Sequence, residues 1–301
     1  MYDLQYVRKR RRRRVAALVS LFASIGITAL VIISFLGRTV GTFTVAIKNT
    51  SVQLALSEKE SFENHTTYLR IDDIPSSYYE FTYDWFDEYG LNNVDNEDND
   101  QSFGLSQDGQ AMYFLKYTFY VKNMGSTTAQ YNMYINLDDS TRSVDGKTLD
   151  DTLRIMVFEN DPKVLDSHDY KVYAKSLSKS VYDVYDKTGE KTDRAFISKV
   201  PEAVAIDNDR YAIYEDDDHP LAYSFSGNGK HVVEKTVPDF KKNDMRRYTV
   251  VYWLEGYASH PEFDENGNLK EPKGAKIKLS IDIHGSVYSS NNTNNSSSNG
   301  N

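Results

Sequence analysis

Regular alternation of apolar and polar residues is the feature that most limits the fold of this chain. Residues 275–283 carry Ala, Ile, Leu, Ile and Ile at every second position, with Lys, Lys, Ser and Asp between them. The same period of two runs through residues 130–138. Side chains of a β-strand point alternately to the two faces of a sheet, so this pattern predicts strands with one buried face. We therefore expect an all-β fold.

The same reasoning predicts a series of short strands separated by turns. We expect the strands at Phe43–Lys48, Val52–Leu56, Tyr113–Lys122, Gln130–Asp138, Leu153–Phe158, Arg210–Tyr214, Leu221–Phe225, Arg247–Leu254 and Ala275–Ile283. Turn-forming pairs such as Asp145-Gly146 and Asn228-Gly229 stand between them. This spacing is typical of an antiparallel β-sandwich of the jelly-roll or immunoglobulin-like kind.

One segment, residues 167–187, leaves two alternatives open. Its apolar residues lie three or four positions apart, as on one face of a helix: Tyr170, Tyr173, Leu177, Val181 and Val184. Tyrosine and valine, however, are residues that fit a pleated sheet. The composition therefore favours strands slightly over a helix.

A charge-free segment follows a run of cations near the N-terminus. Residues 8–14 are seven consecutive Lys and Arg, and the 22 residues 15–36 carry no charge. A helix of that length rises about 33 Å at ~1.5 Å per residue, enough to cross a hydrocarbon core of ~30 Å. Apolar segments of cleaved signal peptides are shorter, roughly 7–15 residues. Because flanking cations stay in the cytoplasm, we expect an uncleaved signal anchor in the plasma membrane with the C-terminal part outside.

Four parts follow from this anchor. We expect a cytoplasmic polybasic segment at 1–14, a transmembrane segment at 15–37, one extracellular domain at 38–288 and a disordered Asn/Ser tail at 289–301. Residues 15–301 carry 28 Lys and Arg against 43 Asp and Glu, a formal charge of −15. An acidic exterior repels nucleic acid, so no nucleic-acid partner is expected.

Several kinds of chemistry are excluded by residues that the chain lacks. It contains no cysteine, which excludes disulfides, zinc–thiolate sites and a cysteine nucleophile. Its six histidines stand singly, and the sequence has no H-E-x-x-H and no G-x-S-x-G motif. We therefore expect no catalytic residues and no cofactor, and a domain held together by its hydrophobic core.

Acidic loops are the best remaining candidates for a site. Residues 72–100 contain ten carboxylates and no Lys or Arg. Calcium takes roughly six to eight oxygen ligands, so Asp95, Glu97, Asp98 and Asp100 are weak calcium candidates. The EF-hand pattern fails, because Asp100 stands where that loop needs glycine. A solvated acidic loop is the simpler interpretation.

Two further clusters deserve a hypothesis each. Seven aromatic residues crowd into residues 78–89 and could line a sugar- or peptide-binding face, although such residues more often belong to a core. A second acidic cluster occupies residues 215–218. Neither cluster defines a site by itself.

Four short blocks carry a family resemblance. Behind the charged N-terminus and the span, they are GTFTV at 41–45, LSE at 56–58, YTFYVKNMGS at 117–126 and RYTVVYWLEG at 247–256. In this order they resemble a group of uncharacterised single-span surface proteins of low-GC Gram-positive bacteria. The third block also resembles, more remotely, the camelysin-like and biofilm-matrix fibre proteins, which are exported β-sandwiches. The resemblance implies a fold and a surface location, and no activity.

The sequence as a whole predicts a protein that acts by contact. We expect adhesion, envelope scaffolding or matrix attachment, with a protein or glycan partner, and no catalysis. A carboxylate-based extracellular hydrolase is the main alternative, since a glycosidase needs two carboxylates ~5–10 Å apart. A sensor or accessory subunit of a membrane complex is another.

Small residues in the span predict self-association. Ala16, Ser20, Ser24 and Thr28 recur every four positions, so they share one face of a helix. Small side chains let two spans approach closely, and hydroxyls can hydrogen-bond across the contact. A homo-oligomer through the span is therefore a further expectation.

Overall fold

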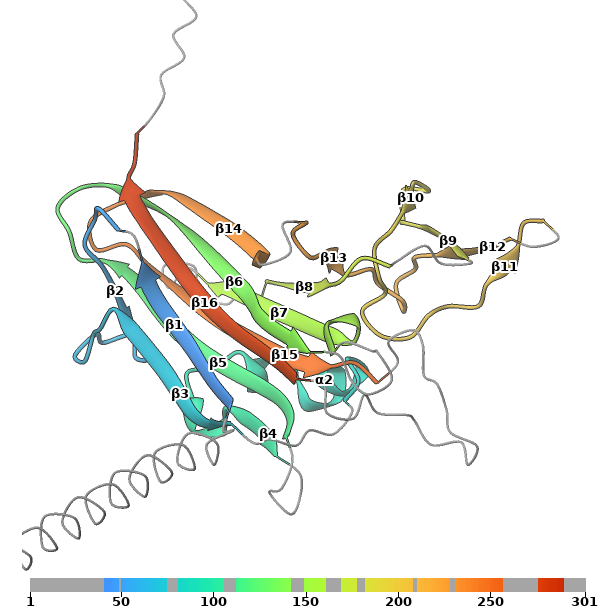
Figure 1. The fold of residues 1–301 in the computed structure, drawn as a ribbon, viewed down its shortest axis with the longest axis horizontal. Helices are drawn as coiled ribbons and strands as arrows, with labels where there is room; N and C mark the ends of the chain where they lie inside the picture. The colour runs from blue at the N-terminus through green and yellow to red at the C-terminus, as the bar shows by residue number, and fades with distance from the viewer. Residues whose placement is uncertain are drawn as a thin grey trace, which may run out of the picture. The chain divides into compact units, whose positions relative to one another are not determined.

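Long strands dominate the described part of this chain (Figure 1). The structure is a computed structural model that describes residues 41–48, 50–74, 81–105, 112–141, 149–160, 169–177, 182–207, 210–227, 231–256 and 276–289. Helices are short in these ranges: α2 (Asp84–Tyr89), α3 (Leu91–Val94) and the 3-10 turns η1 (Asn99–Gln101) and η2 (Leu149–Asp151). The expected all-β class is confirmed.

The expected membrane anchor and the expected tail lie outside the described residues. Residues 1–14 and 15–37, and the tail beyond Ser289, lie outside the described ranges. Across the ranges given above, no helix is both long and apolar enough to cross a membrane.

Three sheets contain the described strands. The five-stranded sheet has the order β14 (His231–Phe240), β6 (Ala129–Thr141), β16 (Lys276–Val287), β1 (Gly41–Lys48), β3 (Tyr68–Ile74). The seven-stranded sheet has the order β13 (Tyr223–Ser224), β8 (Tyr170–Ala174), β7 (Leu153–Asn160), β15 (Met245–Leu254), β5 (Met112–Asn123), β2 (Leu54–Ser57), with β4 (Phe103–Leu105) also paired to β5. The four-stranded sheet has the order β10 (Lys191–Thr192), β9 (Tyr182–Tyr185), β12 (Tyr211–Tyr214), β11 (Val204–Ala205).

The sheets are mixed, which corrects the expectation of purely antiparallel pairing. Three pairs are parallel: β1 with β16, β9 with β12, and β8 with β13. In the first pair Thr44 lies opposite Ser280, so strands from the two ends of the domain meet. A period of two is the same in both kinds of pairing, and no hairpin turn fixes the direction of strands so distant in sequence.

The main core lies between the five-stranded and the seven-stranded sheets, which pack face to face. Alternate side chains of β6 and β16, such as Met133, Ile135 and Ile281, are fully buried against alternate side chains of β5 and β15. Two buried tyrosine hydroxyls, of Tyr131 and Tyr248, bond to each other across this core at 2.7 Å. The core therefore joins residues from both ends of the domain.

The seven-stranded sheet is buried on its second face as well. The side chains of Phe114, Met156 and Val251 on that face pack against Phe86 of α2 and Ile197 of a later loop. Strands covered on both faces lose the alternation of polar residues. This explains why most side chains of β5 and β7 are buried on either face, including the polar Lys116, Thr118 and Arg154.

The open choice over residues 167–187 is settled in favour of strands. The described parts of this segment form β8 and β9, which belong to different sheets. Val172 and Ala174 of β8 are buried in the second core, whereas Val184 of β9 is buried in a smaller one. The helical spacing of apolar residues therefore came from two separate strands.

Candidate binding surface

The four-stranded sheet is built on a small core of its own. Val184 of β9 and Ile213 of β12 pack there with Phe196 and Leu221. The register of the parallel pair sets Val184 beside Ile213. Within the described residues, these four form the buried part of that cluster.

Two pairs of tyrosines stand on this sheet. The same parallel register sets Tyr182 beside Tyr211 and Tyr185 beside Tyr214. The ring centroids are 6.0 Å apart in the first pair and 5.1 Å in the second, where the rings stack at 19°. Since side chains alternate along a strand, the two pairs lie on opposite faces of the sheet.

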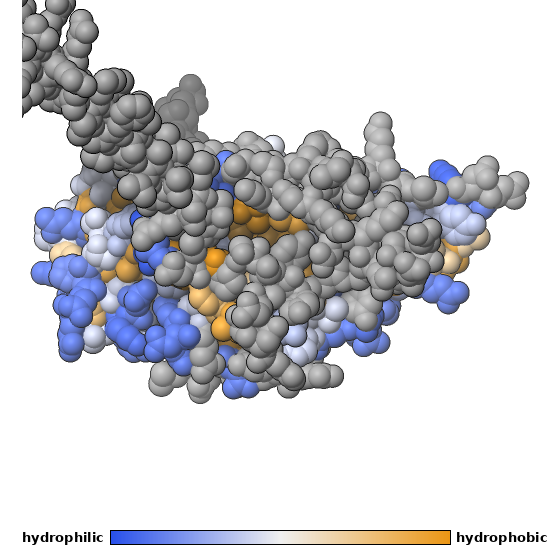
Figure 2. Space-filling view, turned by 60° about the horizontal axis from the view of Figure 1, so that its bottom comes forward, coloured by the Kyte–Doolittle hydropathy of each residue, from blue (hydrophilic) through white to orange (hydrophobic). Residues whose placement is uncertain are grey.

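These tyrosine pairs are well exposed. Tyr182, Tyr211 and Tyr214 keep 45%, 39% and 47% of their surface accessible. Val204 and Ile206, at and just after β11, are exposed too, and apolar residues show at the surface beside hydrophilic ones on the right of Figure 2. Exposed apolar patches on a protein surface often mark sites where another molecule binds. The four-stranded sheet is therefore a candidate binding surface.

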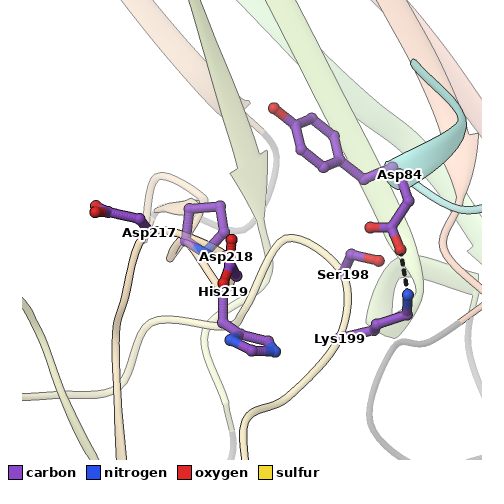
Figure 3. A pocket seen from close by; sticks show the side chains of 8 residues that line it. Asp84, Ser198, Lys199, Asp217, Asp218 and His219 are labelled. Carbon is purple, nitrogen blue, oxygen red and sulfur yellow. Dashed lines mark ion pairs between the residues drawn. The ribbon is translucent and has the colours of Figure 1, made fainter. Parts of the chain in front are cut away.

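A polar cavity of about 490 Å³ lies next to the loop that follows β12. Its lining comes from three segments: Tyr83, Asp84, Ser198, Lys199, Asp217, Asp218, His219 and Pro220 (Figure 3). Across it, Lys199 Nζ and Asp84 Oδ2 form an ion pair at 2.5 Å. Asp217 is paired on the outside with Lys187 Nζ at 2.7 Å. The cavity therefore offers both hydrogen-bond donors and hydrogen-bond acceptors to a ligand.

One buried carboxylate fixes the cavity wall to the seven-stranded sheet. Glu255 accepts hydrogen bonds from the backbone N–H of Tyr83 at 2.9 Å, from Trp253 Nε1 at 2.8 Å and from Ser198 Oγ at 3.1 Å. Three donors from three segments converge on one acceptor. The wall is thus preorganised, as a binding site requires.

The second acidic cluster is a folded loop. Asp216 Oδ1 accepts from the backbone N–H groups of Asp218 and His219 and contacts the His219 ring. The side-chain bond with His219, followed by these backbone bonds, lowers the pKa of Asp216. Glu215 accepts from the backbone N–H groups of Leu221 and Lys187. These carboxylates therefore shape the loop rather than converge on one point.

The four calcium candidates point to different partners. Asp95 is buried and accepts from Asn160, Arg247 and Thr249. Glu97 accepts from the hydroxyl of Tyr120, and Asp98 accepts from the backbone N–H of Asp100. Wherever side chains are described, no three His, Asp or Glu gather as a metal ion would require. The calcium hypothesis stays a prediction without geometric support.

Two of the aromatic residues at 78–89 belong to the core. Phe81 and Phe86 are buried, and Phe86 packs edge-on against Trp253 with centroids 5.2 Å apart. Trp85 alone among the large aromatics described there is more than a third exposed. Tyr78 and Tyr79 lie outside the described residues.

Sequence reasoning missed the tyrosine pairs, although a signal exists. Both strands carry the pattern Y-x-x-Y, Tyr182 to Tyr185 in β9 and Tyr211 to Tyr214 in β12. The repeat shows which residues match, but the pairing of the two strands had to be known before the rings could be placed side by side.

Comparisons of this chain with family models, with curated proteins and with solved structures found no match. The resemblance to single-span surface proteins therefore stays a prediction.

Proposed function

We propose that this chain is a single-span surface protein whose extracellular β-domain acts by contact with a ligand on a neighbouring surface. The observation that carries the proposal is the display of two tyrosine pairs on a small sheet beside the main core. Tyrosine offers a rigid apolar ring and a polar tip, so it gives contact area at a low cost in side-chain entropy. Neither pair is needed to fill the main core.

The packing of the two large sheets supports a more specific fold within this proposal. Because they share one core, we assign the domain to the β-sandwiches, of the jelly-roll or immunoglobulin-like kind. The four-stranded sheet is then an addition to the sandwich. Additions of this kind on a rigid scaffold are where binding residues concentrate.

A glycan is the ligand class that the surface fits best. Exposed ring faces can stack on sugar rings, and the nearby cavity offers carboxylates, an ammonium group and a histidine to hydroxyl groups. Acidic residues dominate the exterior, which disfavours a polyanionic ligand. Adhesion or attachment to an envelope or matrix polysaccharide is the activity we infer.

Binding of the full-length protein to an array of bacterial envelope polysaccharides tests this proposal. Because the two pairs lie on opposite faces, one ligand stacks on one pair. We expect either Tyr211→Ser or Tyr214→Ser to weaken binding roughly 10-fold, the loss that corresponds to ~1.4 kcal/mol at an interface hot spot, and the other variant to bind like the wild type. Tyr68→Ser is the matched control, because Tyr68 is 48% exposed on a different sheet. Equal binding by all three variants, or no binding by the wild type, would overturn the glycan proposal.

The cavity is the one observation that favours the hydrolase alternative. Its lining includes Asp84 and Asp218 together with Tyr83, residue types that a glycosidase site uses. The lysine partners of Asp84 and Asp217 make contact the better proposal, because both carboxylates are already paired. Release of reducing sugar from the bound polysaccharide, abolished by Asp84→Asn and Asp218→Asn together, would favour the enzyme instead.

A further inference from the structure

Lys116 is a buried amine whose hydrogen-bond partners are uncharged groups. It lies on β5, on the second face of the seven-stranded sheet, and is 2% exposed. Its Nζ contacts the side-chain oxygen of Asn96 and donates to the backbone oxygen of Asp98 at 2.9 Å. An ammonium group in such a place is poorly compensated.

Burial changes the chemistry of this amine. Desolvation lowers the pKa of Lys116 to about 8, although the charges of Asp98 and Asp95 oppose the shift. A lysine that spends part of its time neutral near physiological pH is a nucleophile. The side chain that Nζ contacts is the carboxamide of Asn96, which carries an electrophilic carbon.

The Asn96 carboxamide is held ready for attack. Its oxygen accepts a hydrogen bond from the backbone N–H of Asp98 at 2.9 Å, besides contacting Lys116 Nζ. Its nitrogen donates to the backbone oxygen of Asn93 at 2.6 Å. A backbone N–H aimed at a carbonyl oxygen stabilises the negative charge that develops there when a nucleophile adds to the carbon.

Buried hydrogen bonds fix the segment that carries Asn96. Asp95 accepts from Asn160 Nδ2 at 2.7 Å, from Arg247 Nη2 at 2.8 Å and from Thr249 Oγ1 at 2.8 Å. The hydroxyl of Thr118 donates to the backbone oxygen of Asn96 at 2.7 Å. The loop that carries Asn96 is therefore anchored on the sheet face that carries Lys116, and such fixed positions favour a high effective concentration.

We propose that Lys116 and Asn96 join in an intramolecular amide cross-link. The nitrogen Nζ bonds to the Asn96 carboxamide carbon, and the bond from that carbon to Nδ2 breaks. One proton of the amine moves to Nδ2, which leaves as ammonia, and the other stays on the new amide. The reaction needs no oxidant and no cofactor. Asn96 is partly exposed, so water can relay the proton and the ammonia can escape.

The cross-link gives a cysteine-free chain a covalent tie. It links positions 20 residues apart and fastens the segment after α3 to the middle of β5. A domain that binds a ligand on another surface experiences a pulling force. A covalent cross-link resists a force at which hydrogen bonds would break. The inference itself does not depend on the proposed ligand.

Intact-mass measurement of the full-length wild-type protein tests the proposal. We expect a mass below that of the sequence by one molecule of ammonia. Lys116→Met and Asn96→Ala should each restore the full mass expected for the variant. Lys175→Met, which removes a lysine paired at the surface with Asp150, is the matched control and should keep the loss.

Peptide mapping places the loss and excludes ammonia lost elsewhere. No Lys or Arg lies between Arg70 and Lys116, so trypsin would leave both residues in one peptide. Chymotrypsin cuts after Phe103 and Tyr113, between the two, and should release a branched peptide that holds Asn96 and Lys116 together. Wild-type protein of full mass, or free Lys116 in all of its peptides, would overturn the proposal whether or not the variants fold.

Discussion

Buried charges hold the loop segments of this domain onto the seven-stranded sheet. Arg154 is 2% exposed and donates to the backbone oxygens of Phe196 and Ile197, each at 3.0 Å. Desolvation lowers the pKa of Arg154 to about 10, a shift that the charge of Glu255 opposes. Asp95 holds the segment after α3 in the same way. Removing one partner of such a contact leaves the other buried and unpaired.

The first prediction at this scale concerns Asp95. We expect Asp95→Ala to lower the free energy of unfolding by about 3–5 kcal/mol, because Arg247 then lacks its carboxylate. Thermal denaturation of the full-length protein measures this. Asp100→Ala, at an exposed residue of the same loop, should stay within about 0.5 kcal/mol of wild type.

The same measurement separates structure from calcium binding. Ion binding to the folded state alone would make chelation lower the Tm of the wild type. We expect no change on chelation. A shift that disappears in both Asp95→Ala and Asp100→Ala would instead favour the calcium hypothesis.

A second prediction concerns the pH dependence of a free Lys116. In Asn96→Ala the amine cannot be cross-linked. In the chain with Asn96, burial lowers the pKa of this amine from the ordinary 10.5 to about 8, and we expect burial to act in the same direction in the variant. Between these two values the unfolded chain binds more protons than the folded chain, so stability rises with pH. We expect Asn96→Ala to gain stability from about pH 7.5 to 9.5 relative to the double variant with Lys116→Met. If the free energy of unfolding of the two variants changes with pH in the same way, the buried ammonium group of Lys116 does not destabilise the folded state.

Among the strands, the alternation of apolar and polar residues predicted those with one solvent-exposed face. It missed those in which polar residues interrupt the pattern. The strands expected at 130–138 and 275–283 are found, but β6 continues to Thr141 and β16 to Val287. β14 was not predicted, because Glu234, Lys235 and Pro238 interrupt its apolar residues. It is the edge strand of its sheet with two register irregularities, and an edge is where proline is tolerated.

The candidate surface was less predictable than the strands, for a physical reason. Tyr182 and Tyr211 are 29 positions apart and meet only because β9 and β12 pair in parallel. Nothing local in the sequence selects that pairing. Asn96 belongs to a loop and Lys116 to β5. The sequence does not show that this loop packs on the second face of the seven-stranded sheet, so it does not predict their contact.

A third prediction concerns the close contact between β16 and the turn before β2. A Cβ at Gly285 would come within 2.7 Å of Leu54 Cδ1 and 2.8 Å of Thr50 Oγ1. We expect Gly285→Ala to cost about 1–3 kcal/mol by overpacking. Gly227→Ala is the control, since its Cβ would meet no atom within 4 Å. If thermal denaturation gives the two variants the same Tm, the turn is not packed against β16 as described.

At the scale of the molecule, the pairing of β1 with β16 closes the domain. β1 is the first described strand and β16 the last, and both bury side chains in the main core. Both strands are inner strands of the five-stranded sheet, so a chain that lacked either one would have an incomplete sheet. The domain can therefore complete its fold only after the last strand has been synthesised.

Membrane orientation gives the last prediction. Seven cations precede the apolar segment, whereas Arg38 stands alone just after it. This bias should place everything after the span outside the cell. Protease added to intact, wall-stripped cells should digest the β-domain and spare the N-terminus, as immunoblotting with antibodies to either part would show. Replacing residues 8–14 by glutamine should leave part of the protein protected, because the cations set the direction of insertion. Full protection of the wild-type domain would reverse the orientation and, with it, remove the basis for contact with an external glycan.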